Sequence, residues 1–79
     1  MNVNEIFDVI VKNTREVVPA LESHNFDFED SLKELGANSV DRSEIIMMSL
    51  ESLELNVAMI HFARAENMGD LATIMHDKQ

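Results

Sequence analysis

Cysteine is absent from this chain of 79 residues, and so is any apolar run as long as a membrane span. Without cysteine the fold has no disulfide and no thiolate ligand for a metal. A helix needs about 20 consecutive apolar residues to cross a bilayer. The first residues, Met1 to Glu5, also lack the basic segment and apolar run of a secretory signal peptide. We therefore expect a cytoplasmic protein that does not enter a membrane.

Positive charge is scarce as well. Six Lys and Arg residues stand against 15 Asp and Glu residues, which gives a formal net charge of -9. Such a surface repels nucleic-acid phosphates and anionic lipids, so neither is expected as a partner. It attracts proteins that carry basic docking patches. Solubility alone is the simpler explanation of an acidic surface, but the acids that recur after Ser39 favour partner docking.

Recognisable catalytic and metal-binding patterns are also missing. His24, His61 and His76 match no ligand spacing such as His-Glu-x-x-His, and we expect His24 and His76 at the surface and His61 partly buried or exposed. The acids within 27–30 lack the spacing and central glycine of an EF-hand loop, and no Gly-rich phosphate loop occurs. A hydrolase built on Ser39 stays open, although serine hydrolases need an oxyanion hole and an orienting acid in a larger scaffold. We expect no metal site and no enzyme.

Hydrophobic periodicity predicts one all-α domain. Apolar residues recur at three- and four-residue steps from Asn2 to Val18, which indicates an amphipathic helix, and Pro19 ends it. Further helices are predicted over 39–53 and 56–65. The last helix is predicted to begin after Asn67, which is suited to be its N-cap, with Asp70 in the capping-box position. Its inward-facing side chains are predicted to be Leu71, Ile74 and Met75.

The connection over 20–38 is too apolar to be a free linker, because loops of this length without structure are uncommon in compact domains. Phe28, Leu32 and Leu35 are expected to attach it to the core, with a helical turn over 30–35 that Gly36 ends. The resulting fold is a small four-helix bundle with three main helices and a short third helix.

The helix over 39–53 has more apolar residues than one core-facing side needs. Its core positions are predicted to be Ile45, Ile46, Ser49 or Leu50, and Leu53. Apolar side chains rimmed by acids indicate an interaction surface, and methionine suits a surface that adapts to several partners. For either methionine considered singly, packing in the core is the alternative to a place on this interaction surface. The apolar residues left near the surface are Val40, Met47 and Met48, and the acids beside them are Asp41, Glu44 and Glu51.

Ser39 lies where a loop passes directly into this helix. Gly36 bends the loop, and the Asn38–Ser39 pair is suited to cap the helix. The serine hydroxyl then lies at the positive end of the helix dipole, near unpaired backbone N–H groups, where an attached phosphate is electrostatically favoured. Taken alone, Ser39 is explained by helix capping. The absence of a catalytic set favours a serine that carries an attached group over a serine that acts as a catalytic nucleophile.

The segment Leu35-Gly36-Ala37-Asn38-Ser39-Val40-Asp41 resembles the Gly-x-Asp-Ser-Leu-Asp/Glu attachment motif of acyl carrier proteins. The resemblance covers essentially the whole chain, and Met68-Gly69-Asp70-Leu71 is similar to the Val-Gly-Asp-Leu of carrier domains in polyketide synthases. Two positions depart from the pattern, Asn38 in place of Asp and Val40 in place of Leu. The stretch from Asn38 to Glu44 resembles the discrete carriers that donate an acetyl unit in polyketide β-branching.

The resemblance implies a mechanism, a cofactor and a set of partners. A phosphopantetheinyl transferase moves 4'-phosphopantetheine from coenzyme A onto the Ser39 hydroxyl, and the arm then carries an acetyl or malonyl-derived group as a thioester. The other implied partners are an acyltransferase, a decarboxylating ketosynthase-like enzyme and a hydroxymethylglutaryl-synthase-like enzyme. Residues 1–79 would form one monomeric carrier domain of acyl-carrier type. The implied partner-binding residues are Val40, Asp41, Arg42, Glu44, Met47, Met48 and Glu51.

Besides the hydrolase, two other interpretations remain open at this point. An unmodified acidic adaptor would bind its partners through the helix over 39–53, and a peptidyl carrier would have the same attachment chemistry but hold an amino acid. Arg42 interrupts the acidic run, and the sequence leaves open whether it pairs with an acid of the chain or discriminates between partners.

Overall fold

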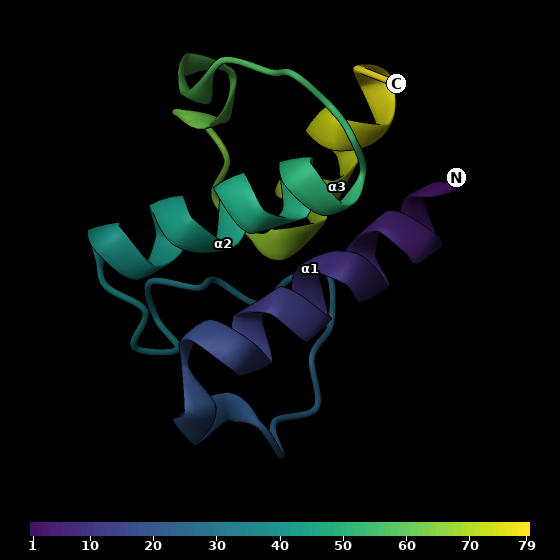
Figure 1. The fold of residues 1–79 in the computed structure, drawn as a ribbon. Coiled ribbons are helices and arrows are strands. Elements are labelled where there is room, and N and C mark those ends of the chain that lie inside the picture. Colours follow the sequence, from purple (N-terminus) through teal and green to yellow (C-terminus); the bar gives the residue numbers. More distant parts are fainter.

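Three α-helices and two 3-10 helices make up the computed structural model, which describes all 79 residues and contains no strand. The α-helices are α1 (Val3–Val17), α2 (Ser39–Ser52) and α3 (Met68–Asp77), and the 3-10 helices are η1 (Pro19–Leu21) and η2 (Met59–Phe62). Helix α1 packs against both α2 and α3, so it forms the centre of the arrangement (Figure 1). The all-helical prediction is confirmed. No helix is both long and apolar enough to cross a bilayer.

Helix α1 begins and ends where the sequence predicts. The Asn2 side chain accepts a hydrogen bond from the Glu5 N–H, and the Glu5 carboxylate accepts one from the Asn2 N–H, which completes a capping box. Val18 leaves the helical region, with φ of -122° and ψ of 85°, because it precedes Pro19. The N-terminal ammonium of Met1 reaches the Gln79 side chain at 3.0 Å, so the two ends of the chain lie side by side (Figure 1).

The core is one apolar cluster drawn from all three α-helices and the connections between them. Within this apolar core the Asn13 amide donates to the Ser49 hydroxyl at 3.0 Å, which joins α1 to α2 and satisfies both buried groups. No buried side-chain nitrogen or oxygen lacks a partner. The cluster consists of Ile6, Phe7, Ile10, Leu32, Ala37, Ile45, Ile46, Leu50, Phe62, Met68, Leu71, Ala72 and Met75.

The long connection between α1 and α2 is held mainly by Leu32, which is buried, with Leu35 half-buried. Phe28 is 37% exposed, so its attachment is weaker than predicted, although its ring lies 4.5 Å from that of Phe7. The predicted turn over 30–35 forms and ends at Gly36, whose φ of 101° is costly for other residues.

The same connection is fastened to the start of α3 by two backbone hydrogen bonds. The Met68 N–H donates to the Asp30 carbonyl at 2.8 Å, and the Gly69 N–H donates to the Phe28 carbonyl at 2.9 Å. A Cβ at Gly69 would lie 2.9 Å from that carbonyl oxygen, so glycine is required here. The Asp27 N–H donates to the Asp30 carboxylate, and this bond, with the nearby His24 ring at 3.0 Å, holds the pKa of Asp30 below its usual value.

The predicted helix over 56–65 is wrong in extent, because only the four residues of η2 are helical. Ala58 precedes η2 in an extended conformation and provides no side-chain cap. A segment of about ten residues is too short to form a stable α-helix by itself. Phe62 is buried and Val57 is half-buried. Met59 and Ile60 are exposed, Ile60 to 78%. The fourth element of the predicted bundle is therefore a single 3-10 segment.

Helix α3 is capped by Asn67 as predicted, since its side chain accepts from the Asp70 N–H at 2.8 Å. The Asp70 carboxylate does not complete a capping box, because it accepts from the Glu66 N–H, one residue earlier than predicted. Leu71 and Met75 are buried as predicted, and Ile74 is half-buried against the core.

Candidate functional site

The start of α2 is built by two consecutive local motifs. The Ala37 N–H donates to the Leu32 carbonyl and the Gly36 N–H to the Lys33 carbonyl, a Schellman pattern that closes the preceding turn. Asn38 follows in an extended conformation and caps α2, with its side chain accepting from the Asp41 N–H at 2.8 Å and the Asp41 carboxylate accepting from the Asn38 N–H at 3.3 Å. Asn38 alone is therefore the cap, which leaves Ser39 as the first residue of the helix.

The Ser39 side chain is exposed and forms no hydrogen bond within the chain. The backbone N–H groups of Ser39 and Val40 have no acceptor either, because the Asn38 side chain uses only that of Asp41. These two N–H groups carry the positive end of the α2 dipole. A free hydroxyl thus lies beside two free backbone donors at the surface, an arrangement that favours an anionic group attached to the serine oxygen.

Arg42 holds the loop before Ser39 in place. Its Nη1 donates to the carbonyl of the buried Ala37 at 2.7 Å, and no acid lies within ion-pair distance of it. The question that the sequence left open is answered in part: Arg42 pairs with a backbone carbonyl and not with an acid of the chain. The hydrogen bond ties the first turn of α2 to the segment that presents the serine.

An open groove runs along α2 from Ser39. Val40 and Met47 are 71% and 59% exposed on it, as predicted, and Met48 is half-buried. Ser43 belongs to the groove but was not predicted; it lies four residues after Ser39, a helical spacing that could have identified it. Asp41 and Arg42 are not part of it. The lining residues are Ser39, Val40, Ser43, Glu44, Met47, Met48 and Glu51.

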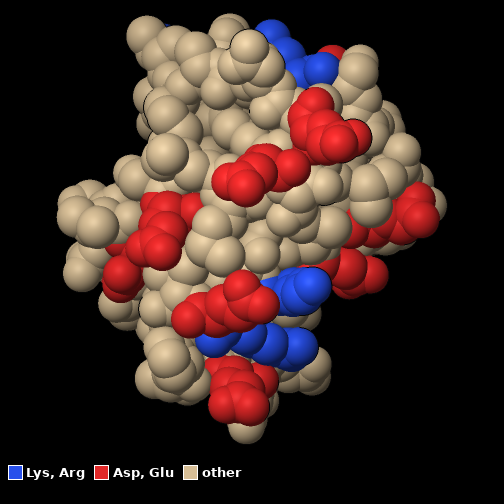
Figure 2. Space-filling view, viewed as in Figure 1, with Lys and Arg blue, Asp and Glu red and all other residues tan.

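The charge around this groove is available to a partner. The only ion pairs within the chain involve histidine, so neither Glu44 nor Glu51 is neutralised by a Lys or Arg of the chain. Figure 2 shows the same imbalance, since Asp and Glu are spread over the visible face while Lys and Arg cover few places. Apolar side chains flanked by unpaired carboxylates complement a surface with a hydrophobic centre and a basic rim.

No catalytic assembly surrounds Ser39. Its hydroxyl has no hydrogen bond to a histidine, and no group of three or more His, Cys, Asp or Glu side chains lies close enough to hold a metal ion. His61 and His76 are exposed, and His24 is half-buried against Asp30. No side chain of the chain is therefore placed to act as a base on the Ser39 hydroxyl.

No protein-family model matches the chain. It is 47% identical over 78 residues to the polyketide biosynthesis acyl-carrier-protein AcpK of Bacillus subtilis (strain 168), a match that covers 99% of this chain and 95% of that protein. Its structure is similar to a chain in the crystal structure of the curacin biosynthetic pathway HMG synthase in complex with acetyl donor-ACP. The TM-score is 0.94 at 45% identity, over 99% of this chain and 100% of that one.

Proposed function

The chain belongs to the acyl carrier proteins of polyketide biosynthesis, and on that premise we propose that Ser39 carries its phosphopantetheine arm. The free hydroxyl of Ser39 at the start of α2 is the observation that supports this assignment most directly. Residues 1–79 would act as one monomeric carrier domain in the cytoplasm. Acyl carriers are not catalysts, which agrees with the lack of a base beside the serine.

The attachment site fits a phosphodiester. The two unpaired N–H groups at Ser39 and Val40 favour negative charge on the serine oxygen. Asp41 is the nearest acid along the chain, and its carboxylate already accepts the Asn38 N–H within the capping box. When bound, the arm supplies a terminal thiol that holds an acyl group as a thioester. The chain itself contributes the presented hydroxyl, the fixed helix start and the surface that partners recognise.

Partner recognition is assigned to the groove along α2. Val40 and Met47 provide exposed apolar contacts beside the attachment point, while Glu44 and Glu51 offer unpaired carboxylates. Met48 adds a half-buried thioether at the edge. The phosphopantetheinyl transferase must contact the same surface because it has to reach the Ser39 hydroxyl. The capped Asp41 and the braced Arg42 are proposed to contribute mainly by fixing the helix start, with their exposed atoms at the edge of the docking surface.

The class of polyketide chemistry follows from the structural relative. That protein is an acetyl donor carrier bound to an HMG synthase, and the present chain shares its fold over the full length. We therefore assign this chain the role of donor in β-branching, with an acetyl group on the arm. An acyltransferase and a decarboxylating ketosynthase-like enzyme would load and process the precursor, and an HMG-synthase-like enzyme would receive the acetyl group.

Intact-mass spectrometry tests the attachment directly. The purified chain is incubated with coenzyme A, magnesium and a promiscuous phosphopantetheinyl transferase, alongside Ser39→Ala and the matched control Ser43→Ala. The wild type and Ser43→Ala should each gain one phosphopantetheine, and Ser39→Ala should gain none. No gain in a folded wild type, with the transferase active on a control carrier, would overturn the carrier assignment and favour an unmodified adaptor.

A second measurement tests the donor role. The acetyl-loaded chain should transfer its acetyl group to an HMG-synthase-like enzyme faster than a peptidyl carrier of the same length does. Equal transfer from both carriers would place the chain in the carrier family without the donor role, and preferential loading with an amino acid would identify a peptidyl carrier.

A further inference from the structure

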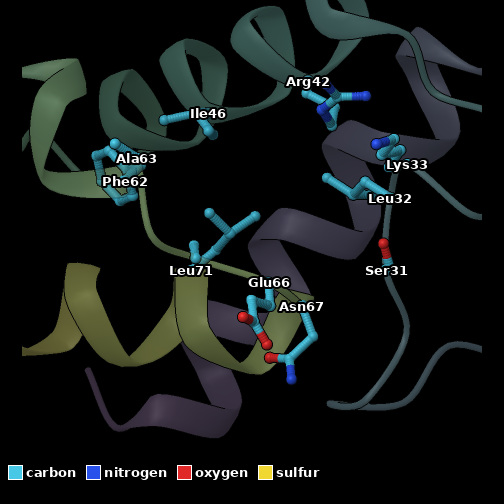
Figure 3. Close-up of a pocket in the computed structure, with 11 residues that line it drawn as sticks. Ser31, Leu32, Lys33, Arg42, Ile46, Phe62, Ala63, Glu66, Asn67 and Leu71 are labelled. Carbon is cyan, nitrogen blue, oxygen red and sulfur yellow. The ribbon is translucent and has the colours of Figure 1, made fainter.

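A cavity of about 410 Å³ lies on the side of α2 away from the groove, between the turn that precedes α2 and the connection that leads into α3 (Figure 3). Its apolar lining includes Leu32 from the turn, Ile46 from α2 and Leu71 from α3. It opens at the surface, where polar side chains from the turn and from α2 form its rim. Of these polar residues the proposed function uses only Arg42, which fixes the start of α2.

Two of the six Lys and Arg residues of the chain, Lys33 and Arg42, line this cavity. Neither has a carboxylate within ion-pair distance, although the chain has 15 acids. Glu66 is the one acid that lines the cavity, and Figure 3 shows it with Asn67 below Leu71, away from the two cations. Lys33 also lines an adjoining hollow with Glu29, Glu34 and Glu66, whereas Arg42 does not, so Arg42 is the stronger of the two cations as a site for an anion.

Arg42 is well prepared to bind such an anion. One guanidinium nitrogen donates to the Ala37 carbonyl at 2.7 Å, which fixes the position of the group, and the remaining N–H donors have no partner in the chain. A guanidinium presents five donors in a planar fork that matches phosphate or carboxylate oxygens. Because part of its mobility is already lost to the Ala37 bond, binding an anion costs less side-chain entropy.

The position of Arg42 relative to Ser39 indicates where the anion comes from. The two residues are three apart on α2, so they are neighbours on the helix surface, although Ser39 lines the groove and Arg42 lines the cavity. Arg42 reaches back toward the segment that precedes the serine, since Ala37 is two residues before it. A group attached to Ser39 that bends toward the cavity therefore comes close to Arg42, which lines it.

We propose that Arg42, assisted by Lys33, binds an anion carried by the Ser39 arm and thereby holds the arm against the mouth of this cavity. The anion is the phosphodiester of the arm or the carboxylate of a carboxylated acyl group such as malonyl. This inference rests on the proposed function, because an unmodified Ser39 brings no anion. It gives Arg42 a binding role in addition to bracing the loop.

The test compares four forms of the chain: unmodified, phosphopantetheine-loaded, acetyl-loaded and malonyl-loaded. The side-chain Nε–H resonance of Arg42 is followed by NMR, and the thermal midpoint is measured in wild type, Arg42→Gln and Lys33→Gln at low and high salt. Lys12→Gln, an exposed cation of α1, is the matched control. The readout is the change between forms within each variant, so lost bracing in Arg42→Gln affects all its forms alike.

In the wild type the Arg42 resonance should move when the anion is introduced, and the thermal midpoint should rise. Arg42→Gln should lose at least about half of that rise, Lys33→Gln a smaller part and Lys12→Gln none, and high salt should reduce it because screening weakens exposed ion pairs. A change on loading phosphopantetheine identifies the phosphodiester, and a change only on malonyl loading identifies the carboxylate.

Two results separate failure of this inference from failure of the proposed function. An unmoved Arg42 resonance in all loaded forms, with full loading shown by mass, would overturn the inference and leave the carrier role intact. The same rise in thermal midpoint in wild type and in both variants would overturn it as well. Failure to load any group would instead contradict the proposed function.

Discussion

Helices α1 and α2 begin with the same capping motif but differ in how far their apolar residues are buried. Both start with an Asn whose side chain accepts from the third helical residue, where Glu5 in α1 and Asp41 in α2 complete the capping box. In α1 no large apolar residue is exposed. In α2 the buried Ile45 and Ile46 satisfy the core, and Val40 and Met47 remain in solvent.

This difference in burial separates the apolar residues that core packing explains from those that it does not explain. Packing on the core explains the large apolar residues of α1 except the half-buried Val9, because the apolar stripe matches the face that packs on α2 and α3. Burial leaves the exposed apolar residues of α2 unexplained, and they lie in the groove beside the candidate attachment serine. Core packing thus accounts for the apolar stripe of α1, while the exposed apolar residues of α2 are the ones that the proposed function assigns to partner contacts. Paired substitutions in the two helices test this difference.

The largest expected effect is a difference in stability between the two helices. Ile10→Ala removes a fully buried side chain of α1 and should cost about 2–5 kcal/mol in the free energy of unfolding. Met47→Ala removes an exposed side chain of α2 and should change it by less than about 0.5 kcal/mol. Urea denaturation followed by circular dichroism measures both. Ile10→Val, at about 0.5–1.5 kcal/mol, keeps the chain folded if the alanine variant does not fold.

Binding should show the opposite order. Met47→Ala should weaken the complex with a partner enzyme by about 1 kcal/mol or more if the side chain is a central contact, and Ile10→Val should leave the affinity unchanged. Titration calorimetry of the loaded carrier with an HMG-synthase-like enzyme measures both. A Met47→Ala variant that loses stability but binds normally would show that the methionine serves packing, and the distinction between the helices would fail.

Much of the fold was predictable because local chemistry and tertiary packing agree. The stripe of α1 and the stop at Pro19 determine that helix in isolation, and the core positions Ile45, Ile46 and Leu50 follow from the same periodicity. Asn67 is a cap in the sequence and in the structure. The exposure of Val40 and Met47 was also predictable, since α2 has more apolar residues than one face can bury.

Features set by distant or backbone contacts were not predictable. The segment over 56–65 has a helical pattern, but backbone conformation limits it to η2. Arg42 finds a backbone carbonyl, which no charge pattern reveals. The Asp70 carboxylate accepts the N–H of Glu66, because the connection folds back there. A standard capping box would use the N–H of the next residue, Asn67. Ser43 joins the groove only because the helix places it between Ser39 and Met47.

Removing the two Asn caps tests the shared start of the helices. Asn2→Ala and Asn38→Ala should each lower the free energy of unfolding by about 1 kcal/mol, because each leaves a backbone N–H without its acceptor. Only Asn38→Ala should also slow phosphopantetheine transfer, since a frayed α2 no longer holds Ser39 in place. Asn38→Asp should restore both properties. Equal transfer rates in the two alanine variants would show that the transferase does not need a fixed helix start.

The smallest expected effect concerns the way the two helices end. Helix α1 ends at Val18 and Pro19 without any residue of positive φ, whereas α2 ends in a Schellman pattern with Glu54 at a φ of 56°. A left-handed conformation costs a residue with a Cβ about 1–2 kcal/mol, and glycine avoids that cost but loses more entropy on folding. Glu54→Gly should therefore stabilise the chain by about 0.5–1 kcal/mol, measured by urea denaturation.

Two controls make this last comparison specific. Glu54→Ala keeps a Cβ at the same φ and should leave the stability close to that of the wild type, which separates backbone conformation from loss of one negative charge. Val18→Gly, at the end of α1, should destabilise the chain because its φ of -122° gives glycine no advantage and the half-buried side chain is lost. If Glu54→Gly and Glu54→Ala stabilised the chain equally, charge repulsion at the end of α2 would be the cause, and the two helix ends would differ in electrostatics and not in backbone strain.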